Sequence, residues 1–301
     1  MTFIKKGFRM YTMNAHAKIN LGLDIIGVRE DGYHLLRMVM QSLKLHDTVT
    51  VTEESPEYGI RTVTDSEEVE DDQRNLAYRA AFLLKEKYGI SSGIGIHIKK
   101  EIPVAAGLAG GSSDAAAVMK AVNELFSLGL SVEELKREGV KLGADVPYCL
   151  EGGTRLSEGI GEVLTPVTPG LKECGILLVK PAGGVSTKEV YEAYDGAEHS
   201  VHPDIDGIIN DIRNGDITGL GHRIGNVLED VTIPRVPEIQ KIKDWLYKKG
   251  LQGVLMSGSG PTVFAIDENR QLLTEAADGC RERFPDCRVI LTETCSEKEK
   301  V

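Results

Sequence analysis

A glycine-rich stretch at residues 103–114 is the part of the sequence best suited to chemistry. It reads Pro-Val-Ala-Ala-Gly-Leu-Ala-Gly-Gly-Ser-Ser-Asp, and an alanine-rich helical pattern follows it at once. Glycines let a ligand approach the backbone closely, and Ser112 and Ser113 are good N-cap residues for a helix that we expect to begin near Asp114. Free N–H groups and the positive end of the helix dipole would meet there. The stretch is a candidate phosphate-binding loop, although in isolation a plain strand-to-helix turn explains it equally well.

Three further clusters could complete such a site. Lys18 and Asn20 share one face of an alternating stretch, where an ammonium and an amide suit a phosphate and a hydroxyl; a solvent-facing strand face is the plainer explanation. Asp145 stands between Gly-Ala and Val-Pro, at an expected helix-to-strand junction, and suits a general base, although turn-forming aspartates are commoner. Residues 257–262 form a second Gly/Ser loop, which a hairpin turn would also explain. Each cluster is weak alone, and their joint presence in this order is informative.

Several common phosphate and metal motifs are absent from the sequence. It contains no G-x-x-x-x-G-K-[ST] loop, no H-R-D and D-F-G pair and no H-E-x-x-H. The dinucleotide fingerprint is not matched either, because no acidic residue ends a neighbouring parallel strand about 20 residues further on. The glycine-rich loop must therefore belong to another phosphate-binding scheme.

Composition limits the partners and the compartment. The chain has 301 residues and a formal net charge of -11, which argues against nucleic acid or an anionic membrane as its main partner. No apolar run approaches the ~18 residues of a membrane span, and the first dozen residues lack a signal peptide's apolar region, so that Met10 or Met13 could be the natural start. The five cysteines form no C-x-x-C pair and are expected to be reduced thiols: Cys149, Cys174, Cys280, Cys287 and Cys295. We expect a cytoplasmic protein, with monomer and homodimer both open.

Hydrophobic periodicity and turn residues place these clusters on elements. In the first half we expect strands at 15–26, 33–45, 47–52 and 94–98, an acidic loop or edge hairpin at 53–74, and helices at 75–89, 115–126 and 131–143. A seam rich in Gly, Thr and Pro follows at 160–170. Beyond it we expect strands at 176–179, 253–256, 262–266 and 287–293, and helices from 186 and at 203–213, 216–229, 237–249 and 269–283. The second half is predicted to be an α+β sandwich, with an antiparallel sheet on one side and helices on the other.

The motifs together resemble a known superfamily. The stretches A-K-I-N-L, P-x-x-x-G-L-x-G-G-S-S-D and S-G-S-G-P-T occur in the order found in the GHMP kinases, and they span nearly the whole chain. R-E-D-G-Y-H at 29–34 and G-A-D-V-P at 143–147 are similar to the branch that phosphorylates the cytidine diphosphate derivative of a methylerythritol, in the non-mevalonate isoprenoid pathway. Residues 185–191 and 226–229 add to this resemblance.

The resemblance implies a two-domain α+β kinase. Its N-terminal domain, at residues 1–165, would have the ribosomal protein S5 domain 2-like fold and bind ATP. Its C-terminal domain, at residues 166–301, would be ferredoxin-like and bind the substrate in the cleft between the two. Ala105 and Ala106 depart mildly from the family's more glycine-rich loop; we expect alanine to cost little there because negative φ suits it.

The resemblance also implies roles for individual residues. Asp145 matches the catalytic base that accepts the proton of the attacking 2-hydroxyl. Lys18 matches the catalytic lysine, which would hold Asp145 ionised and stabilise the transferring phosphoryl group. Asn20 would orient the substrate. Its cytosine would be recognised by the residues Tyr33, His34, Thr187 and Tyr191.

For ATP, the glycine-rich loop would wrap the phosphates, and Asn75 and Lys100 would lie beside the nucleotide. The loop residues concerned are Pro103, Val104, Ala105, Ala106, Gly107, Leu108, Ala109, Gly110, Gly111, Ser112 and Ser113. A supporting loop would pack against them: Ser257, Gly258, Ser259 and Gly260. Mg²⁺ is expected with ATP, held mainly by phosphates, water and a serine, and no carboxylate ligand is assigned.

Two alternatives stay open. One is a GHMP kinase for another small alcohol, such as homoserine or mevalonate; Tyr33 and His34 disfavour it, because a substrate without a base needs no aromatic platform. The other is a GHMP-fold binding protein without catalysis. Lys18 and Asp145 disfavour that one, because a pure binder has no physical need for a poised base.

Overall fold

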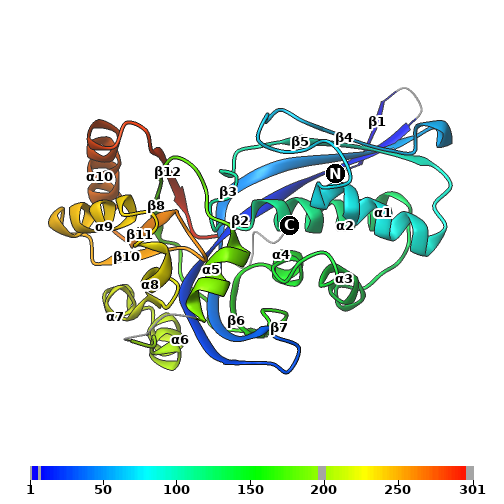
Figure 1. The fold of residues 1–301 in the computed structure, drawn as a ribbon. Helices are drawn as coiled ribbons and strands as arrows, with labels where there is room; N and C mark the ends of the chain where they lie inside the picture. Colours follow the sequence, from blue (N-terminus) through cyan, green and yellow to red (C-terminus); the bar gives the residue numbers. More distant parts are fainter. Residues whose placement is uncertain (1, 6–7, 196–200, 296–301) are drawn as a thin grey trace.

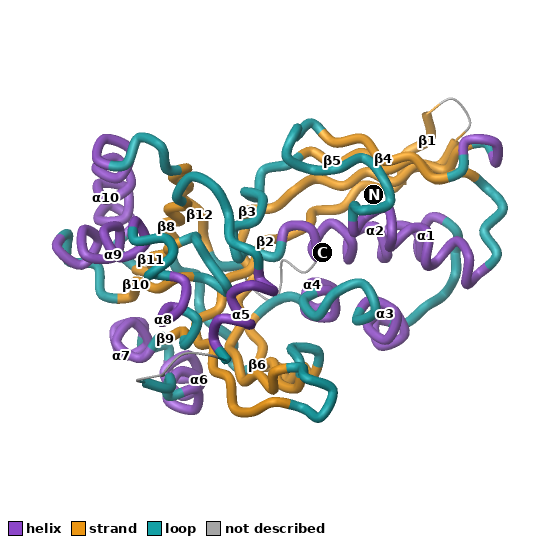
Figure 2. The backbone as a smooth tube through the Cα atoms, in the orientation of Figure 1, coloured by secondary structure: helices purple, strands orange, loops and turns teal. Residues whose placement is uncertain are grey.

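Two sheets and the helices that cover them make up the fold (Figures 1 and 2). The structure, a computed structural model, describes residues 2–5, 8–195 and 201–295. Residues 1 and 6–7 of the expected leader lie outside these ranges.

The larger sheet contains eight strands in the part of the chain that is described. They are β1 (Thr2–Lys5), β2 (Phe8–Val28), β3 (His34–Glu54), β4 (Ile60–Thr64), β5 (Gly93–Lys99), β6 (Thr154–Gly159), β7 (Val163–Pro166) and β9 (Gly225–Asn226). The order is β1-β2-β3-β5-β4; β6 pairs with β3 and β7, and β9 pairs with β2. The pairs β4–β5 and β2–β9 are parallel, and the other pairs are antiparallel.

The smaller sheet is antiparallel throughout. Its order is β10 (Gly253–Met256), β11 (Val263–Asp267), β8 (Gly175–Lys180) and β12 (Arg288–Glu293). These are short, largely apolar strands, and the helices α9 (Glu238–Lys248) and α10 (Arg270–Arg283) cover them (Figure 1). The predicted α+β sandwich is confirmed.

The remaining helices cover the large sheet or border the cleft. They are α1 (Leu76–Tyr88), α2 (Gly110–Leu125), α3 (Val132–Gly139), α4 (Val146–Glu151), α5 (Thr187–Tyr194), α6 (Ile205–Asn214), α7 (Ile217–Arg223) and α8 (Glu229–Thr232). Polar side chains cap α1, α3 and α5. Asn75 accepts a hydrogen bond from Ala77 N at the start of α1, and Ser131 with Glu134 forms a capping box on α3. At α5, Ser186 accepts from Glu189 N.

Strand β2 differs from the half-exposed strand that alternation alone would explain. Ile19 and Leu21 are fully buried, as the pattern predicts, but Lys18 and Asn20 on the other face are only 4% and 1% exposed. The Lys18 ammonium lies against Gly107 and Asp145, and the Asn20 amide lies against Met38, so other parts of the chain cover these two side chains. The plain explanation of Lys18 and Asn20 as a solvated face is therefore wrong, and an ammonium and an amide are held in the interior.

Strands β3 and β4 correct two further expectations. The predicted strands 33–45 and 47–52 are one 21-residue strand, β3, because it runs along β2 with only local register shifts. The acidic stretch 53–74 holds a short 3₁₀ turn (Pro56–Tyr58) and then β4, which pairs parallel to β5 at the sheet edge, so it is not a hairpin.

Helix α2 begins four residues earlier than predicted. Its N-cap is Ala109, in the left-handed conformation with φ 58°, so Ser112 and Ser113 lie inside the first turn and are not caps. Composition alone favoured serine over alanine as the cap. The backbone path out of the loop decides otherwise, because left-handed Ala109 turns the chain directly into the helix.

Other boundaries in this region also move. Helix α3 ends at Gly139, not at Gly143. Asp145 stands at the N-cap of the short helix α4, between two helices, and not at a helix-to-strand junction.

The predicted helix 216–229 is interrupted. It divides into α7, the two-residue strand β9 and α8. Asn226 causes the interruption. Its side-chain amide donates to the carbonyls of Met256 and Gly258, and its oxygen accepts from Leu228 N. A continuous helix could not make these bonds.

The two halves of the chain share a hydrophobic core. One buried cluster contains Ile19 and Leu21 of β2 together with Leu178 of β8 and Phe264 of β11. Elements from the two sheets are therefore packed together, which fixes the site described below. The boundary at residue 165 stays a prediction, since β7 runs across it.

Two expectations from composition concern the described residues. Within them, no helix is both long enough and apolar enough to span a membrane. All five cysteines are free thiols.

Candidate active site

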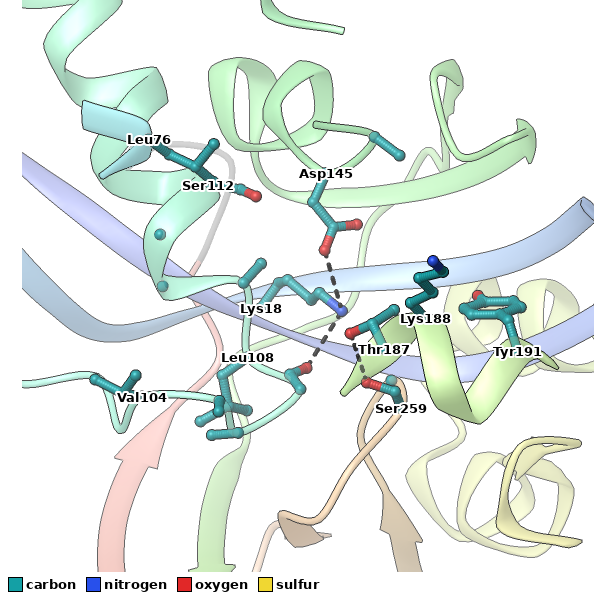
Figure 3. Close-up of a pocket in the computed structure, with 18 of the residues that line it drawn as sticks. Lys18, Leu76, Val104, Leu108, Ser112, Asp145, Thr187, Lys188, Tyr191 and Ser259 are labelled. Carbon is teal, nitrogen blue, oxygen red and sulfur yellow. Dashed lines mark hydrogen bonds and ion pairs between the residues drawn. The ribbon is translucent and has the colours of Figure 1, made fainter. Parts of the chain in front are cut away.

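A pocket of about 990 Å³ lies between the large sheet and the C-terminal half (Figure 3). Its walls come from β2, from the turn before β3, from the glycine-rich loop, from the start of α4 and from α5. Such a volume is typical of a site that takes an organic ligand of drug size or larger. The clusters singled out in the sequence meet here, although Lys18 and Ser259 stand far apart in the chain.

Lys18 lies at the centre of the pocket. Its ammonium donates to Asn20 Oδ1 at 2.7 Å and to the carbonyl of Gly107 at 3.3 Å, and it lies 3.7 Å from Asp145 Oδ2 (Figure 3). The lysine side chain is 5% exposed, whereas the Asp145 side chain is 34% exposed. The cation is thus fixed in the interior while the carboxylate faces the open space of the pocket. Asn20 uses its oxygen to hold the lysine.

The glycine-rich loop lines the pocket from Pro103 to Ser112. Gly107 has φ 74°, and a Cβ there would lie 2.1 Å from Ser257 O, so only glycine fits between the two loops. Ser113 is different. Its hydroxyl donates to His16 O at 2.6 Å and its N–H donates to Ala109 O, so it braces the loop against β2 and does not face the pocket.

The alanines of this loop correct an expectation. Ala105 has φ 49° and Ala109 has φ 58°, so the left-handed conformation occurs at two non-glycine residues. Ala105 was expected at negative φ. Left-handed alanine stores backbone strain, which is held here because the loop is packed on both sides; Gly184, for example, leaves room for the Ala105 side chain.

The loop 257–260 supports the glycine-rich loop from below. Ser257 Oγ donates to Gly107 O at 3.0 Å, and Gly258 and Ser259 line the pocket. Gly260 does not line it, and turns the chain at φ 86°. Asn226 holds this loop through the Gly258 carbonyl, a role that the sequence reasoning missed because it placed Asn226 inside a helix.

Aromatic side chains gather at the far end of the pocket. Tyr33 is 60% exposed, and His34 lies 5.1 Å from the ring of Tyr191 on α5. His34 Nε2 is 2.7 Å from Asp195 Oδ1, at the end of α5. Thr187, at the start of the same helix, hydrogen-bonds to Ser259 (3.0 Å between the hydroxyl oxygens). This end is a platform suited to a flat ring, and Asp195 is a further member that the sequence reasoning did not find.

Asn75 and Lys100 line the pocket, but their polar atoms are engaged elsewhere. The Asn75 side chain caps α1 and donates to Glu70 O at 2.8 Å. Lys100 is buried between Asp47, at 2.5 Å, and Asp114, at 2.8 Å. Both residues are therefore parts of the pocket wall, and their position beside a nucleotide stays a prediction.

The cluster of Asp47, Lys100 and Asp114 carries two carboxylates for one ammonium. Asp47 also accepts from the N–H groups of Glu101 and Ile102, whereas Asp114 Oδ1 is buried without a hydrogen-bond partner. Burial, more than any neighbour, raises the pKa of Asp114 to about 7.

Cys149 lies on α4, where its backbone N–H donates to the carbonyl of Asp145. Burial, with Asp145 adding to it, raises the pKa of Cys149 to about 12, and its sulfur lies 3.3 Å from Ser113 Oγ. A thiol that stays protonated at neutral pH is a poor nucleophile, so covalent cysteine chemistry is not favoured at this site.

Comparison with known protein families assigns the class. The model for the N-terminal domain of GHMP kinases matches residues 75–153, and the model for their C-terminal part matches residues 208–286. The first match contains the glycine-rich loop and Asp145. The second contains Asn226 and the supporting loop.

Comparison with individual proteins shows which GHMP kinases this chain resembles. The 4-diphosphocytidyl-2-C-methyl-D-erythritol kinase of Clostridium beijerinckii is 46% identical over 94% of this chain and 99% of its own length. A crystal structure of 4-(cytidine 5'-diphospho)-2C-methyl-D-erythritol kinase superposes with a TM-score of 0.79 at 32% identity, over 94% of this chain and 99% of that one. A homoserine kinase from Cytophaga hutchinsonii, with a TM-score of 0.75 and 17% identity over 97% of this chain and 96% of its own, shares the fold alone. The chain belongs to the GHMP kinases and, among them, to the family of 4-diphosphocytidyl-2-C-methyl-D-erythritol kinases.

Proposed function

We propose that this kinase transfers the γ-phosphoryl group of ATP to the 2-hydroxyl of 4-diphosphocytidyl-2-C-methyl-D-erythritol, a step of the non-mevalonate isoprenoid pathway. The family uses ATP, and its named members at 46% identity support the substrate. The observation that carries the proposal is the proximity of Lys18 to Asp145. The two side chains line the same pocket as the glycine-rich loop, which is suited to phosphates.

Asp145 acts as the general base. Its carboxylate is partly exposed to the pocket, so a hydroxyl can approach it and give up its proton as the oxygen attacks phosphorus. The ammonium of Lys18 lies 3.7 Å from this carboxylate and attracts it.

Lys18 also compensates charge on the transferring group. Phosphoryl transfer depends on positioning and electrostatic stabilisation more than on covalent help from the protein. Asn20 and the Gly107 carbonyl hold the ammonium in place before substrate arrives, so no reorganisation is needed during the reaction. We therefore assign two roles to Asn20: it positions Lys18, and it orients the substrate.

The phosphates of ATP lie along the glycine-rich loop. The N-terminus of α2 begins at Gly110, where free N–H groups and the positive end of the dipole favour an anion. The Ser112 hydroxyl lines the same wall, whereas the Ser113 hydroxyl is used by His16 O. We therefore assign phosphate contact to residues 103–112 and a bracing role to Ser113.

The residues fit a Mg²⁺ ion that arrives with the nucleotide. Among the described residues, no group of three or more histidine, cysteine, aspartate or glutamate side chains could hold a metal ion by itself. Oxygen donors that line the pocket near the loop include the hydroxyl of Ser112 and the carboxylates of Asp114 and Asp145. When bound, the ion would neutralise charge between the β- and γ-phosphates.

The cytosine of the substrate lies at the aromatic end. Tyr33 and Tyr191 offer ring faces for stacking, and the ring of His34 lies 5.1 Å from that of Tyr191. Homoserine and mevalonate have no ring to occupy this end, which disfavours them as substrates.

A coupled assay of ADP release tests the proposal. ATP and Mg²⁺ are supplied with 4-diphosphocytidyl-2-C-methyl-D-erythritol, with homoserine or with mevalonate. We expect ADP release with the cytidine compound alone. Release of ADP only with homoserine or mevalonate would overturn the proposed substrate. Binding of ATP without ADP release in any arm would favour a non-catalytic binding protein.

A further inference from the structure

Lys188 stands in the second position of α5 and lines the pocket with an exposed ammonium. Its side chain is 84% exposed. Figure 3 shows it leaving α5 between Thr187 and Tyr191, on the side of the helix that faces Asp145. It therefore lies between the aromatic end of the pocket and the catalytic pair.

Among the described residues that line the pocket, the other lysine and arginine side chains already have partners within the protein. Lys18 is held by Asn20 and Asp145. Lys100 is buried between two aspartates. Arg74 pairs with Glu70 and Asp72 within its own exposed segment. Lys188 makes a long contact of 3.7 Å with Glu192, and both of these side chains are largely exposed, so this pair holds its ammonium weakly.

Local stability does not explain a lysine at this position. The first turn of a helix favours acidic side chains, because the N–H groups there carry the positive end of the dipole. Lys188 opposes that preference and has no buried partner to compensate for it. Residues that break a local rule without structural gain are candidates for a functional role.

A substrate of the proposed kind needs a cation in this place. Its diphosphate joins the cytidine to the alcohol, so it must lie between the base platform and Asp145. The acidic groups of the same wall, Glu192 and Asp195, would repel a diphosphate that had no cation nearby.

We propose that Lys188 binds the diphosphate of the cytidine substrate. This inference rests on the proposed function. Lys188 is a binding residue for the substrate's linker and takes no part in the transfer itself. It contributes to the affinity for the diphosphate and not to the affinity for the nucleoside.

Calorimetric titration with cytidine and with cytidine diphosphate tests the inference. The protein is first saturated with a non-hydrolysable ATP analogue and Mg²⁺, so that the probes cannot enter the nucleotide site. Unaltered protein should bind cytidine diphosphate more tightly than cytidine. In Lys188→Ala the affinity for cytidine diphosphate should fall about 3- to 10-fold, with cytidine unchanged, because one charge-assisted contact is lost. Lys188→Arg should retain most of the affinity.

Matched variants and separate outcomes make the test decisive. Lys241→Ala, which removes an exposed lysine on α9, should change neither affinity. Glu192→Gln should strengthen binding of cytidine diphosphate, because it removes the competing carboxylate. Equal affinities of Lys188→Ala and unaltered protein for cytidine diphosphate would overturn the role of Lys188 and leave the proposed function standing. Failure of the unaltered protein to bind either probe would overturn the proposed substrate and the inference with it.

Discussion

Asp145 and Lys18 divide their tasks by exposure. The lysine side chain is almost fully enclosed and tied to Asn20 and Gly107, whereas the carboxylate is one third exposed to the pocket. A buried and tethered cation is a fixed field source, and an accessible carboxylate is a group that can receive a proton. Their separation of 3.7 Å leaves them coupled by charge.

The base assignment predicts the behaviour of Asp145→Asn. An amide cannot accept the hydroxyl proton, so kcat should fall at least about 100-fold, while the dissociation constant for ATP changes less than about twofold. Coupled turnover and nucleotide titration measure the two quantities. Asp286→Asn, an exposed change after α10, is the control and should leave both unchanged. An unreduced kcat in Asp145→Asn would remove the carboxylate from the mechanism.

Ala105 shows strain stored at a single residue. Because its φ is 49°, Ala105→Gly should raise the free energy of unfolding by about 1 kcal/mol, since glycine adopts this conformation without a Cβ clash. Urea denaturation followed by circular dichroism measures the change. Ala106→Gly is the matched control. Because Ala106 is buried and not at positive φ, the free energy of unfolding of this variant should fall by about 1 kcal/mol. A loss of stability in both variants would show that Ala105 is unstrained.

Three elements meet at Lys100 behind the glycine-rich loop. Asp47 belongs to β3, Lys100 follows β5, and Asp114 belongs to the first turns of α2. The single ammonium therefore joins the sheet to the helix that begins within the glycine-rich loop. This junction explains why the loop between β5 and α2 can keep strained residues.

The raised pKa of Asp114 predicts a pH-dependent stability. Its folded pKa of about 7 lies above the ordinary 3.8, so protonation stabilises the folded state fully below pH 4, and this contribution is lost as the pH rises to about 7. Between pH 5 and 7 the free energy of unfolding of the unaltered protein should fall relative to Asp114→Asn, by at most about 1.4 kcal/mol per pH unit. Urea denaturation at pH 5, 6, 7 and 8 checks this. Parallel curves for the two proteins would show that Asp114 is ionised across the range.

At the scale of the whole molecule, the aromatic end of the pocket is assembled from both halves of the chain. His34 begins β3, and Asp195 follows α5, yet Nε2 and Oδ1 are 2.7 Å apart. This contact joins the end of α5 to the start of β3, where the ring of Tyr191 lies 5.1 Å from that of His34. We expect Asp195 to be a positioning residue that acts through His34.

Asp195→Ala should weaken the cytidine end alone. We expect the KM for the cytidine substrate to rise about 3- to 10-fold with kcat and the KM for ATP nearly unchanged, because the lost contact orients the base platform and not the phosphates. Steady-state kinetics measure the split. Asp206→Ala removes another exposed aspartate that pairs with β3, through Arg37, but it does not line the pocket, and it should leave all three constants unchanged. Equal effects of the two variants would mean that Asp195 serves general stability.

Many of the helices and strands of this protein can be predicted from local sequence, because caps, turns and hydrophobic periodicity each depend on a few neighbouring residues. Asn75 and the capping box at Ser131 mark where α1 and α3 begin. The alternating pattern of β2 predicts that Ile19 and Leu21 are buried, and the three motifs indicate the GHMP kinase family. Local rules fail where a distant partner decides. Asn226 interrupts a helix to hold a loop 30 residues away, and Ala109 replaces serine as the cap of α2.

The burial of Lys18, its distance from Asp145, and the contact of His34 with Asp195 were likewise decided only in three dimensions. The sequence determined which residues could do the chemistry, since residue type and spacing are written in it. The packing of α2 and α5 against the strands decided which of them meet, because contacts between residues more than 100 positions apart depend on the path of the whole chain.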